Sequence, residues 1–294
     1  MTDPAVPDAW LDLLEALEGE AGAVMVIGGV DTGKTVLACW LAEQLAGRGP
    51  AAMADSDLGQ SVLGPPGTVG WRMVGADASE FIFVGEISPA RRPLGTATAT
   101  WRACVRAREA GAAWLVLDTS GYVDGLGAAA LKRAKMDLVR PTDVVLIEDS
   151  PDRLTAIARA IRPDEARVHR LQPAPPVEAR SPARRREFRE ERFRECLAGA
   201  TLRRIPLAGR AVYGGRPWRW GPAWPTLEGR LRGMLVGLSD AEGIGLALGL
   251  LRGVEDAGET LLLLAQPVDA GRIAAVSFGN IRLREDGTQI IDET

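Results

Sequence analysis

The sequence is poor in the residues that build several common kinds of functional site. It contains three cysteines, Cys39, Cys104 and Cys196, without the spacing of a metal or redox motif, and a single histidine, His169. One histidine excludes histidine-rich metal sites and catalytic triads that use histidine as the base. Isolated cysteines are typical of small buried side chains in a protein of a reducing compartment.

Long apolar runs and a net positive charge are also missing. No apolar run reaches the length of about 18 residues that predicts a membrane span. The N-terminus, MTDPAVPDAW, has no basic stretch before an apolar core, so we expect no signal peptide and a cytoplasmic protein. The net charge of −4 over 294 residues does not indicate a nucleic-acid binder, and leaves only a local basic patch for such a role.

What the sequence does contain is a phosphate-binding motif near its start. The stretch GGVDTGKT satisfies the pattern G-x-x-x-x-G-K-[ST]. Its glycines let the backbone turn N–H groups toward phosphate oxygens, Lys34 reaches the terminal phosphates, and the Thr35 hydroxyl is a ligand for Mg²⁺. The dipole of the helix that follows favours the same anion. The residues predicted to hold the nucleotide are Gly28, Gly29, Val30, Asp31, Thr32, Gly33, Lys34, Thr35 and Val36.

Strand-like apolar runs alternate with helical patterns over about residues 24–171. Such alternation is typical of a parallel sheet covered by helices on both faces, which with the phosphate loop predicts an α/β fold of the P-loop NTPase kind. The predicted strands are 24–27, 51–54, 81–84, 114–117, 144–147 and 168–171. The predicted helices are 8–18, one from about 36 to 45, 95–110, 126–139 and 152–161.

Acidic residues follow two of the predicted strands. Asp55 and Asp57 come after strand 51–54, and Asp118 follows directly on strand 114–117. The carboxyl end of a strand beside a phosphate loop is where a metal ligand or a general base belongs, and Asp118 is placed for Mg²⁺ or its water. Asp55 and Asp57 share one face if their segment is extended. The alternative for this pair is an Asp-rich turn before a loop.

The densest basic stretch of the chain is RSPARRREFREERFRECLAG, residues 180–199. As a helix it presents three arginines on one face and two apolar residues on another: Arg185, Arg189 and Arg192, and Phe193 with Leu197. One interpretation is a solvated helix held by salt bridges. The other is a clamp for phosphates, which arginine in place of lysine and the nearby nucleotide domain favour. The segment by itself leaves both open.

The pattern changes near residue 200. Short apolar runs of β character, interrupted by Gly, Pro and Asp, predict a small β-rich domain over 200–294 after a P-loop domain over 1–199. Trp218, Trp220 and Trp224 lie in a loop rich in proline, glycine and arginine. Aromatic rings beside arginines stack on bases in many nucleic-acid binders, but a lid over the β-domain core is an equally good interpretation.

Five motifs follow one another in the order and at the spacing found in one family. They are GGVDTGKT, DSDLGQ with PPG, VGEISP, DTSGYVDGLG and RSPARRREFREERFRECLAG. By these motifs the chain resembles the polynucleotide 5′-hydroxyl kinases of RNA processing, which include the kinase subunit of the eukaryotic pre-mRNA cleavage machinery, rRNA-processing kinases and archaeal relatives. The resemblance covers about residues 22–290, because LVGLSDAEGIGLALGLLRGV and FGNIRL resemble the family's small β-rich C-terminal domain.

The resemblance implies transfer of the γ-phosphoryl group of ATP to the 5′-hydroxyl end of RNA or DNA, with ATP and Mg²⁺ as cofactors. Lys34 and Thr35 match the residues that hold the ATP phosphates and the metal. Asp57 matches the acidic residue that activates the 5′-hydroxyl, and Gln60 lines the same site. We therefore expect Mg²⁺ near Thr35, Asp57 and Asp118.

Two further motifs complete the implied site. The family's clasp, which holds the 5′ end of the acceptor, corresponds to Thr119, Ser120, Gly121 and Tyr122. Tyr122 stands where the clasp usually has tryptophan. The arginine-rich lid corresponds to about residues 180–197, and Arg185 and Arg189 match the R-x-x-x-R pair that closes over the phosphates. With Lys34 and Asp57, these two arginines form the expected catalytic set.

Two other functions are compatible with the phosphate loop. One is a non-catalytic ATP-binding subunit of an RNA-processing complex, and the other is a switch-type P-loop ATPase. The first is disfavoured because Lys34, Asp57 and both lid arginines are present; the second lacks an N-K-x-D motif and a cysteine pair for metal delivery. The chain starts shortly before the phosphate loop, so we expect no counterpart of the N-terminal domain of the eukaryotic members. Neither a membrane nor a particular protein partner is indicated.

Overall fold

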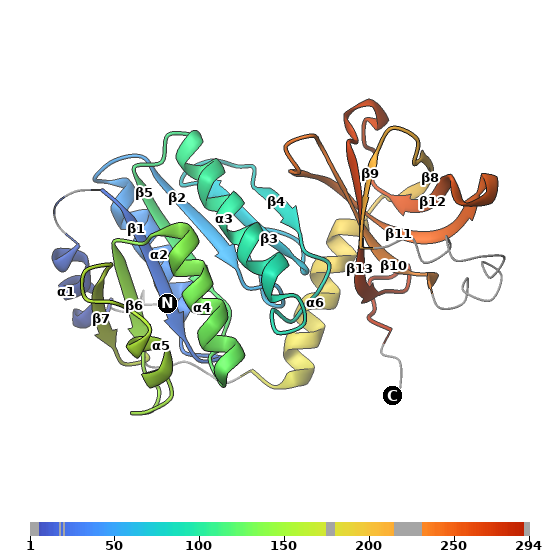
Figure 1. Ribbon diagram of the computed structural model, residues 1–294. Coiled ribbons are helices and arrows are strands. Elements are labelled where there is room, and N and C mark those ends of the chain that lie inside the picture. Colours follow the sequence, from blue (N-terminus) through green and yellow to red (C-terminus); the bar gives the residue numbers. More distant parts are fainter. Residues whose placement is uncertain (1–5, 18, 20, 175–179, 215–230, 291–294) are drawn as a thin grey trace, which may run out of the picture.

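The first part of the chain is built around a seven-stranded sheet with the strand order β4-β3-β2-β5-β1-β6-β7 (Figure 1). The structure is a computed structural model that describes residues 6–17, 19, 21–174, 180–214 and 231–290. The strands of this sheet are β1 (Ala23–Gly28), β2 (Ala51–Ser56), β3 (Thr68–Met73), β4 (Glu80–Phe83), β5 (Trp114–Thr119), β6 (Asp143–Ile147) and β7 (Arg167–Leu171).

The sheet is mostly parallel, as the alternating pattern predicts. Strands β1, β2, β5, β6 and β7 run in one direction. Strand β3, which the sequence pattern does not predict, runs antiparallel between β2 and β4. Gly70 interrupts the apolar pattern in its middle, and a Cβ there would lie 2.5 Å from the carbonyl oxygen of Leu63. The predicted parallel sheet is confirmed, and β3 is an added antiparallel strand in which a close backbone approach requires glycine.

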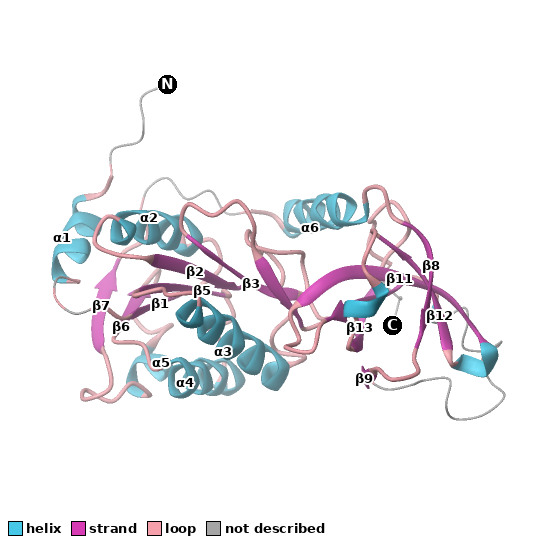
Figure 2. Cartoon of the chain, turned by 90° about the horizontal axis from the view of Figure 1, so that it is seen from above, coloured by secondary structure: helices cyan, strands magenta, loops and turns pink. Residues whose placement is uncertain are grey.

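Helices cover both faces of this sheet (Figure 2). They are α1 (Asp8–Ala16), α2 (Lys34–Ala46), α3 (Pro93–Glu109), α4 (Leu126–Val139) and α5 (Thr155–Arg159). The side chains of β1 alternate between the faces: Val24 and Val26 pack with α1 and α2, whereas Met25 and Ile27 pack with α3 and α4. Since both faces are covered, the central strands are apolar throughout. The helix predicted over 152–161 is shorter, because residues 151–154 form a turn.

A second sheet follows, with six strands in the order β8-β12-β11-β10-β13-β9. They are β8 (Thr201–Pro206), β9 (Ala211–Tyr213), β10 (Met234–Ser239), β11 (Gly245–Glu255), β12 (Thr260–Ala265) and β13 (Ala275–Arg282). The prediction of a β-rich C-terminal part is confirmed. Trp218, Trp220 and Trp224 lie outside the described residues.

Helix α6 (Pro182–Leu197) connects the two sheets in space (Figure 1). Its apolar residues Phe193 and Leu197 are buried, as predicted, against side chains of the second sheet such as Leu235 and Leu250. Phe83 of β4 packs against the same cluster. The predicted domain boundary, between residues 199 and 200, falls just after α6, but the apolar face of this helix belongs to the core of the second sheet. The arginine-rich helix α6 thus packs on the second sheet through its apolar face and extends toward the P-loop sheet.

Two expectations about the chain's general properties bear on the fold. None of the described helices is long and apolar enough to cross a membrane. Cys39, Cys104 and Cys196 are all free thiols, and Cys104 is a buried residue of α3. Burial raises the pKa of the Cys104 thiol to about 12, so it acts as a small apolar side chain.

Candidate active site

The phosphate motif forms a loop between β1 and α2, at the carboxyl ends of the parallel strands. Asp31 and Gly33 adopt left-handed backbone conformations, with φ of 56° and 84°, and the Thr32 hydroxyl donates to the Gly29 carbonyl at 3.0 Å. These features fold the chain back so that α2 begins at Lys34. The free N–H groups of its first turn therefore lie at this edge of the sheet, as an anion site requires. Val30 and Val36 are exposed, so only their backbone faces the loop interior.

Lys34 and Thr35 carry the reactive side chains of the loop. Lys34 is 7% exposed and its ammonium group donates to the Gly29 carbonyl. Burial lowers the pKa of Lys34, while the carboxylates of Asp118 and Asp57 oppose that shift. The Thr35 hydroxyl donates to Oδ2 of Asp118 at 2.6 Å. The structure thus joins the loop to the end of β5, 83 positions later in the chain.

Asp55 and Asp118 lie side by side in register on β2 and β5, and both are buried. Burial raises the pKa of both carboxyl groups, with repulsion by Asp118 adding to the shift of Asp55 and repulsion by Asp57 adding to that of Asp118. Asp55 accepts from the backbone N–H groups of Asp57 at 2.9 Å and Val62 at 2.6 Å. Its carboxylate therefore builds the turn after β2, which is the turn interpretation of the acidic pair. Oδ1 of Asp118, in contrast, is buried without a hydrogen-bond partner.

Asp57 lies beyond the end of β2 and is partly exposed. Its Oδ1 accepts from the N–H groups of Gly59 and Gln60, both at 3.0 Å, which fixes the orientation of the carboxylate. The Gln60 side chain donates to the carbonyl of Arg185 on α6 at 3.1 Å. The 57–60 turn is thus in contact with the arginine-rich helix, as the family resemblance implies.

The predicted clasp follows β5 directly. The Thr119 hydroxyl is buried and donates to the carbonyl of Val26 at 2.7 Å, so this side chain shapes the site from beneath. Ser120 is also buried, and its hydroxyl has no partner. Gly121 lies against the phosphate loop, where a Cβ would come within 2.8 Å of the backbone of Val30. Tyr122 is partly exposed and is the aromatic member of the clasp.

The arginine-rich helix reaches the phosphate loop through Arg185. Its guanidinium group forms an ion pair with Asp31 at 3.0 Å, and the same carboxylate oxygen accepts from the N–H of Arg180. Arg189 lies one turn further along and donates to the side chain of Gln289 at 3.0 Å. Burial lowers the pKa of Arg189. The structure therefore brings both predicted lid arginines to the site, although Arg189 is held by the C-terminal segment rather than by the loop.

The predicted metal ligands are only partly assembled. The described residues include no cluster of three or more His, Cys, Asp or Glu side chains placed to hold a metal ion. Mg²⁺, however, needs only one or two carboxylates when phosphate oxygens and water complete its shell. Thr35 and Asp118 touch, and the free Oδ1 of Asp118 is a hard oxygen ligand without a partner. This pair fits Mg²⁺ beside a nucleotide, whereas Asp57, the third predicted ligand, has one oxygen engaged by backbone N–H groups.

Sequence reasoning missed Lys132 and Lys135 of α4. Both are completely buried and point under the site: Lys132 donates to Thr119 and Ser120, and Lys135 donates to Ser56. They share helical spacing with the apolar residues of α4, but lysine is a residue type that is rarely buried. A signal did exist, because the chain has only three lysines, Lys34, Lys132 and Lys135, among 35 basic residues. All three are buried at this site.

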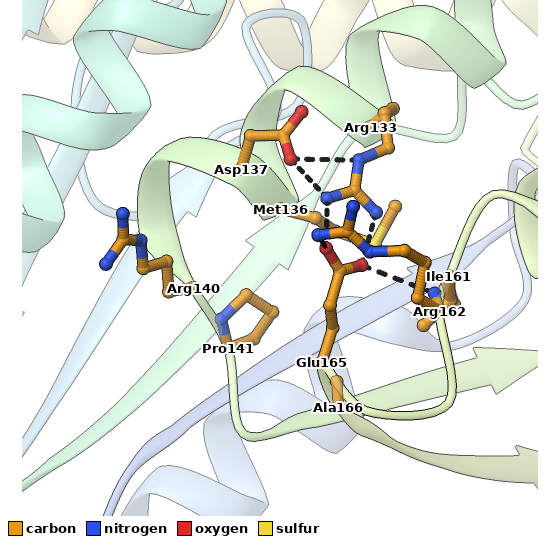
Figure 3. A pocket seen from close by; sticks show the side chains of 9 residues that line it. All are labelled: Arg133, Met136, Asp137, Arg140, Pro141, Ile161, Arg162, Glu165 and Ala166. Carbon is orange, nitrogen blue, oxygen red and sulfur yellow. Dashed lines mark hydrogen bonds and ion pairs between the residues drawn. The ribbon is translucent and has the colours of Figure 1, made fainter.

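A cavity of about 470 Å³ lies at the opposite edge of the sheet, where β6 and β7 begin (Figure 3). Arg133 there binds the carboxylates of Asp137 and Glu165, and Arg162 binds Glu165 as well (Figure 3). None of the predicted site residues lines this cavity. Because parallel α/β proteins bind ligands at the carboxyl ends of their strands, the phosphate-loop edge is the candidate active site.

Comparison with known families agrees with this geometry. The family described as mRNA cleavage and polyadenylation factor CLP1 P-loop matches residues 28–199, which run from the phosphate loop through α6. The chain belongs to the CLP1 P-loop family. The match includes every residue predicted for the site, from the phosphate loop to the lid arginines.

Relatives of this CLP1 P-loop chain extend the match beyond residues 28–199. It is 26% identical to a polyribonucleotide 5′-hydroxyl-kinase of Pyrococcus furiosus, over 91% of this chain and 89% of that protein. Two further proteins named polyribonucleotide 5′-hydroxyl-kinase, from Pyrococcus horikoshii and Methanocaldococcus jannaschii, are 27% and 25% identical to it, each over 91% of this chain. The alignment therefore covers the second sheet as well as the P-loop part.

Solved structures show the same fold at lower sequence identity. The structure of a wild-type Clp1p–Pcf11p complex superposes with a TM-score of 0.68 at 13% identity, over 94% of this chain and 79% of the other. The similarity covers both sheets, so the arrangement of a P-loop sheet with a second β sheet is that of the CLP1 proteins.

Proposed function

We propose that this protein is an ATP-dependent polynucleotide 5′-hydroxyl kinase that acts on RNA. The observation that carries the proposal is the position of Arg185, which touches both halves of the site. Its side chain pairs with Asp31 of the phosphate loop, and its carbonyl accepts from Gln60 beside Asp57. A helix that joins a phosphate site to a carboxylate turn fits a transfer between two substrates better than simple hydrolysis. The polyribonucleotide kinases among the relatives support RNA as the acceptor.

The donor half is the phosphate loop. ATP phosphates would lie against the N–H groups of the loop and the first turn of α2, with Lys34 beside the β and γ phosphates. Thr35 and Asp118 are the residues that would hold Mg²⁺. A bound Mg²⁺ supplies neutralisation of the phosphate charge at this place. The Asp118 carboxylate also opposes the lowering of the Lys34 pKa that burial causes.

The acceptor half is the 57–60 turn and the clasp. Asp57 is oriented by two backbone N–H groups through one oxygen, which leaves its other oxygen for the 5′-hydroxyl. In the transfer, the 5′-oxygen forms a bond to the γ-phosphorus, and the bond from that phosphorus to the β–γ bridging oxygen breaks. ADP leaves, and the hydroxyl proton passes to Asp57. Tyr122 offers an aromatic face on which the terminal base stacks.

Arg185 and Arg189 complete the charge balance during transfer. Phosphoryl transfer depends mainly on positioning and on neutralising charge on the transferred group, because little covalent chemistry involves the protein. Arg185 exchanges its bond to Asp31 for one to the phosphoryl oxygens, and Arg189 lies one turn away on the same helix. The guanidinium fork suits these oxygens better than an ammonium group does.

The test is transfer of label from γ-labelled ATP to a 5′-hydroxyl RNA oligonucleotide. Lys34→Ala and Asp57→Asn each reduce labelling by more than about a hundredfold. The first removes the positive charge beside the transferred phosphoryl group, and the second removes the acceptor of the 5′-hydroxyl proton. Asp137→Asn, at the opposite edge of the sheet, is the matched control and keeps wild-type labelling. All variants must show one cooperative melting transition. Near wild-type labelling by Lys34→Ala or Asp57→Asn would contradict the proposal.

Two outcomes distinguish the other functions. A chain that binds ATP but transfers nothing in a single turnover is a binding subunit. A chain that hydrolyses ATP at a rate indifferent to 5′-hydroxyl ends is a switch-type ATPase. Comparison of matched RNA and DNA acceptors, single- and double-stranded, then defines the substrate.

A further inference from the structure

The chain uses lysine only where a cation is buried. All three lysines of the sequence are at most 7% exposed, whereas its many arginines supply the cations of the surface ion pairs. Lys132 and Lys135 are completely buried and lie three positions apart on α4, on the face that packs against the sheet. A guanidinium group is larger and cannot lose its proton, so arginine does not substitute at such positions.

Lys132 lies beneath the clasp. Its ammonium group donates to the hydroxyl of Thr119 at 2.9 Å and to the carbonyl of Ser120 at 2.7 Å. The Thr119 hydroxyl in turn donates to the carbonyl of Val26, in the strand that leads into the phosphate loop. One buried cation thereby fixes two consecutive residues of the turn that carries Gly121 and Tyr122.

Lys135 lies beneath the end of β2. Its ammonium group donates to the Ser56 hydroxyl at 2.7 Å, and that hydroxyl donates to the carbonyl of Asp118 at 2.9 Å. Ser56 directly precedes Asp57, and Asp118 directly precedes Thr119. The lysine therefore ties the last residue of β2 to β5 next to the proposed proton acceptor.

Stability alone does not account for two buried lysines. Burial lowers the pKa of both lysines, and the ammonium groups of Lys135 and Lys34 repel that of Lys132 and lower its pKa further. Buried Asp55 and Asp118 offset this repulsion only in part, since they repel each other as well. Apolar residues of similar volume in place of buried charges often leave stability unchanged or raise it. The cost of four buried charges points to a role in holding the site.

We propose that Lys132 and Lys135 are positioning residues for the acceptor half of the site. Lys132 fixes the 119–122 turn that receives the 5′ end, and Lys135 fixes the Ser56–Asp57 segment that receives its proton. Neither ammonium group is placed on the donor phosphates. This inference rests on the proposed kinase function for its kinetic consequences, but its structural part holds for the chain without substrates.

The experiment compares Lys132→Met and Lys135→Met with wild type. Methionine keeps the length and removes the donors. Amide hydrogen exchange without substrates is expected to rise at 119–124 in Lys132→Met and at 56–60 in Lys135→Met, with each variant sparing the other's segment. In kinase assays, each variant raises the KM for the acceptor or lowers kcat about tenfold, while the KM for ATP stays within about twofold, as expected for the loss of hydrogen bonds to a charged group.

Arg133→Met is the matched control on the same helix, because Arg133 makes its ion pairs at the opposite edge of the sheet. It is expected to lower the melting temperature without changing exchange at 119–124 or the KM for the acceptor. Where Lys132→Met fails to fold, Lys132→Gln keeps a donor and is expected to give an intermediate effect.

Three results would overturn the inference. They are unchanged exchange in both segments, loosening spread over the whole chain, and equal effects on the KM for ATP and for the acceptor. Absence of kinase activity in the wild-type chain would instead overturn the proposed function. The exchange measurements would still decide the role of the two lysines in that case.

Discussion

The guanidinium group of Arg185 lies 3.0 Å from the carboxylate of Asp31, although 154 positions separate the two residues in the sequence. The N–H of Arg180 donates to the same oxygen. Asp31 thus fastens the start of α6 to the phosphate loop. This ion pair also explains why a phosphate-binding loop carries an acidic residue, since the negative charge of Asp31 by itself opposes the binding of phosphate.

Asp31→Asn tests this role. Asparagine tolerates the left-handed conformation of Asp31, so the loop keeps its shape. The ion pair is partly exposed and contributes at most about 1 kcal/mol, so the melting temperature changes little. Hydrogen exchange at 180–190 is expected to rise, and kcat is expected to fall. Unchanged hydrogen exchange at 180–190 would mean that α6 is held at the site only by Gln60 and by the packing of the helix's own apolar face.

Arg185→Ala and Arg189→Ala are expected to lower kcat by about a hundredfold each, because each removes a cation from the transferred group. The KM for ATP changes less, since the loop holds the other phosphates. Steady-state kinetics with saturating RNA measure both constants. Arg184→Ala, an exposed neighbour on the same helix, is the control and retains wild-type rates. If it lost as much activity as Arg185→Ala, general loss of positive charge would explain the effect.

Asp143, a buried carboxylate at the opposite edge of the sheet, makes part of the protein's stability depend on pH. Burial would raise the pKa of Asp143, but hydrogen bonds from His169, Arg167 and Thr142 outweigh it and lower that pKa. A lowered pKa contributes stability above the ordinary value of about 4 for an unfolded aspartate, and that contribution is lost as the pH falls through the folded pKa.

Asp143→Asn is therefore expected to lower the free energy of unfolding by about 1–3 kcal/mol at pH 7. The difference from wild type shrinks as the pH falls below about 4 and through the lowered folded pKa, because the wild-type carboxylate then becomes neutral like the asparagine amide. Urea unfolding at pH 3 to 7 measures it. A difference that stayed constant over this range would show that packing, rather than charge, holds this cluster.

Much of the P-loop part follows from the sequence, because its signals are local. The apolar run of β1, the glycines of the loop and the period of α2 lie within about 20 adjacent residues. The position of Asp118 follows as well, since parallel strands end at one edge. These patterns place Lys34, Thr35 and Asp57 near one another without any knowledge of distant contacts.

The parts that escaped prediction depend on distant contacts. In strand β3, Gly70 leaves room for the backbone of Leu63, a close approach that no local pattern reveals. Lysine is normally a solvated residue, so Lys132 and Lys135 are not expected on the buried face of α4, and only the polar groups at the ends of β2 and β5 make their burial possible. Likewise, no pattern in the arginine-rich segment shows that Arg185 meets Asp31 while Arg189 meets Gln289.

The most direct test of the proposed kinase activity compares two RNA oligonucleotides of one sequence, one with a 5′-hydroxyl and one with a 5′-phosphate. Each is incubated with the wild-type protein, Mg²⁺ and γ-labelled ATP. Label is expected to appear at the 5′ end of the hydroxyl RNA, with one ADP formed per labelled end, and not on the 5′-phosphate RNA. Release of free phosphate at the same rate with either RNA, without labelled RNA, would contradict the account of a two-substrate site.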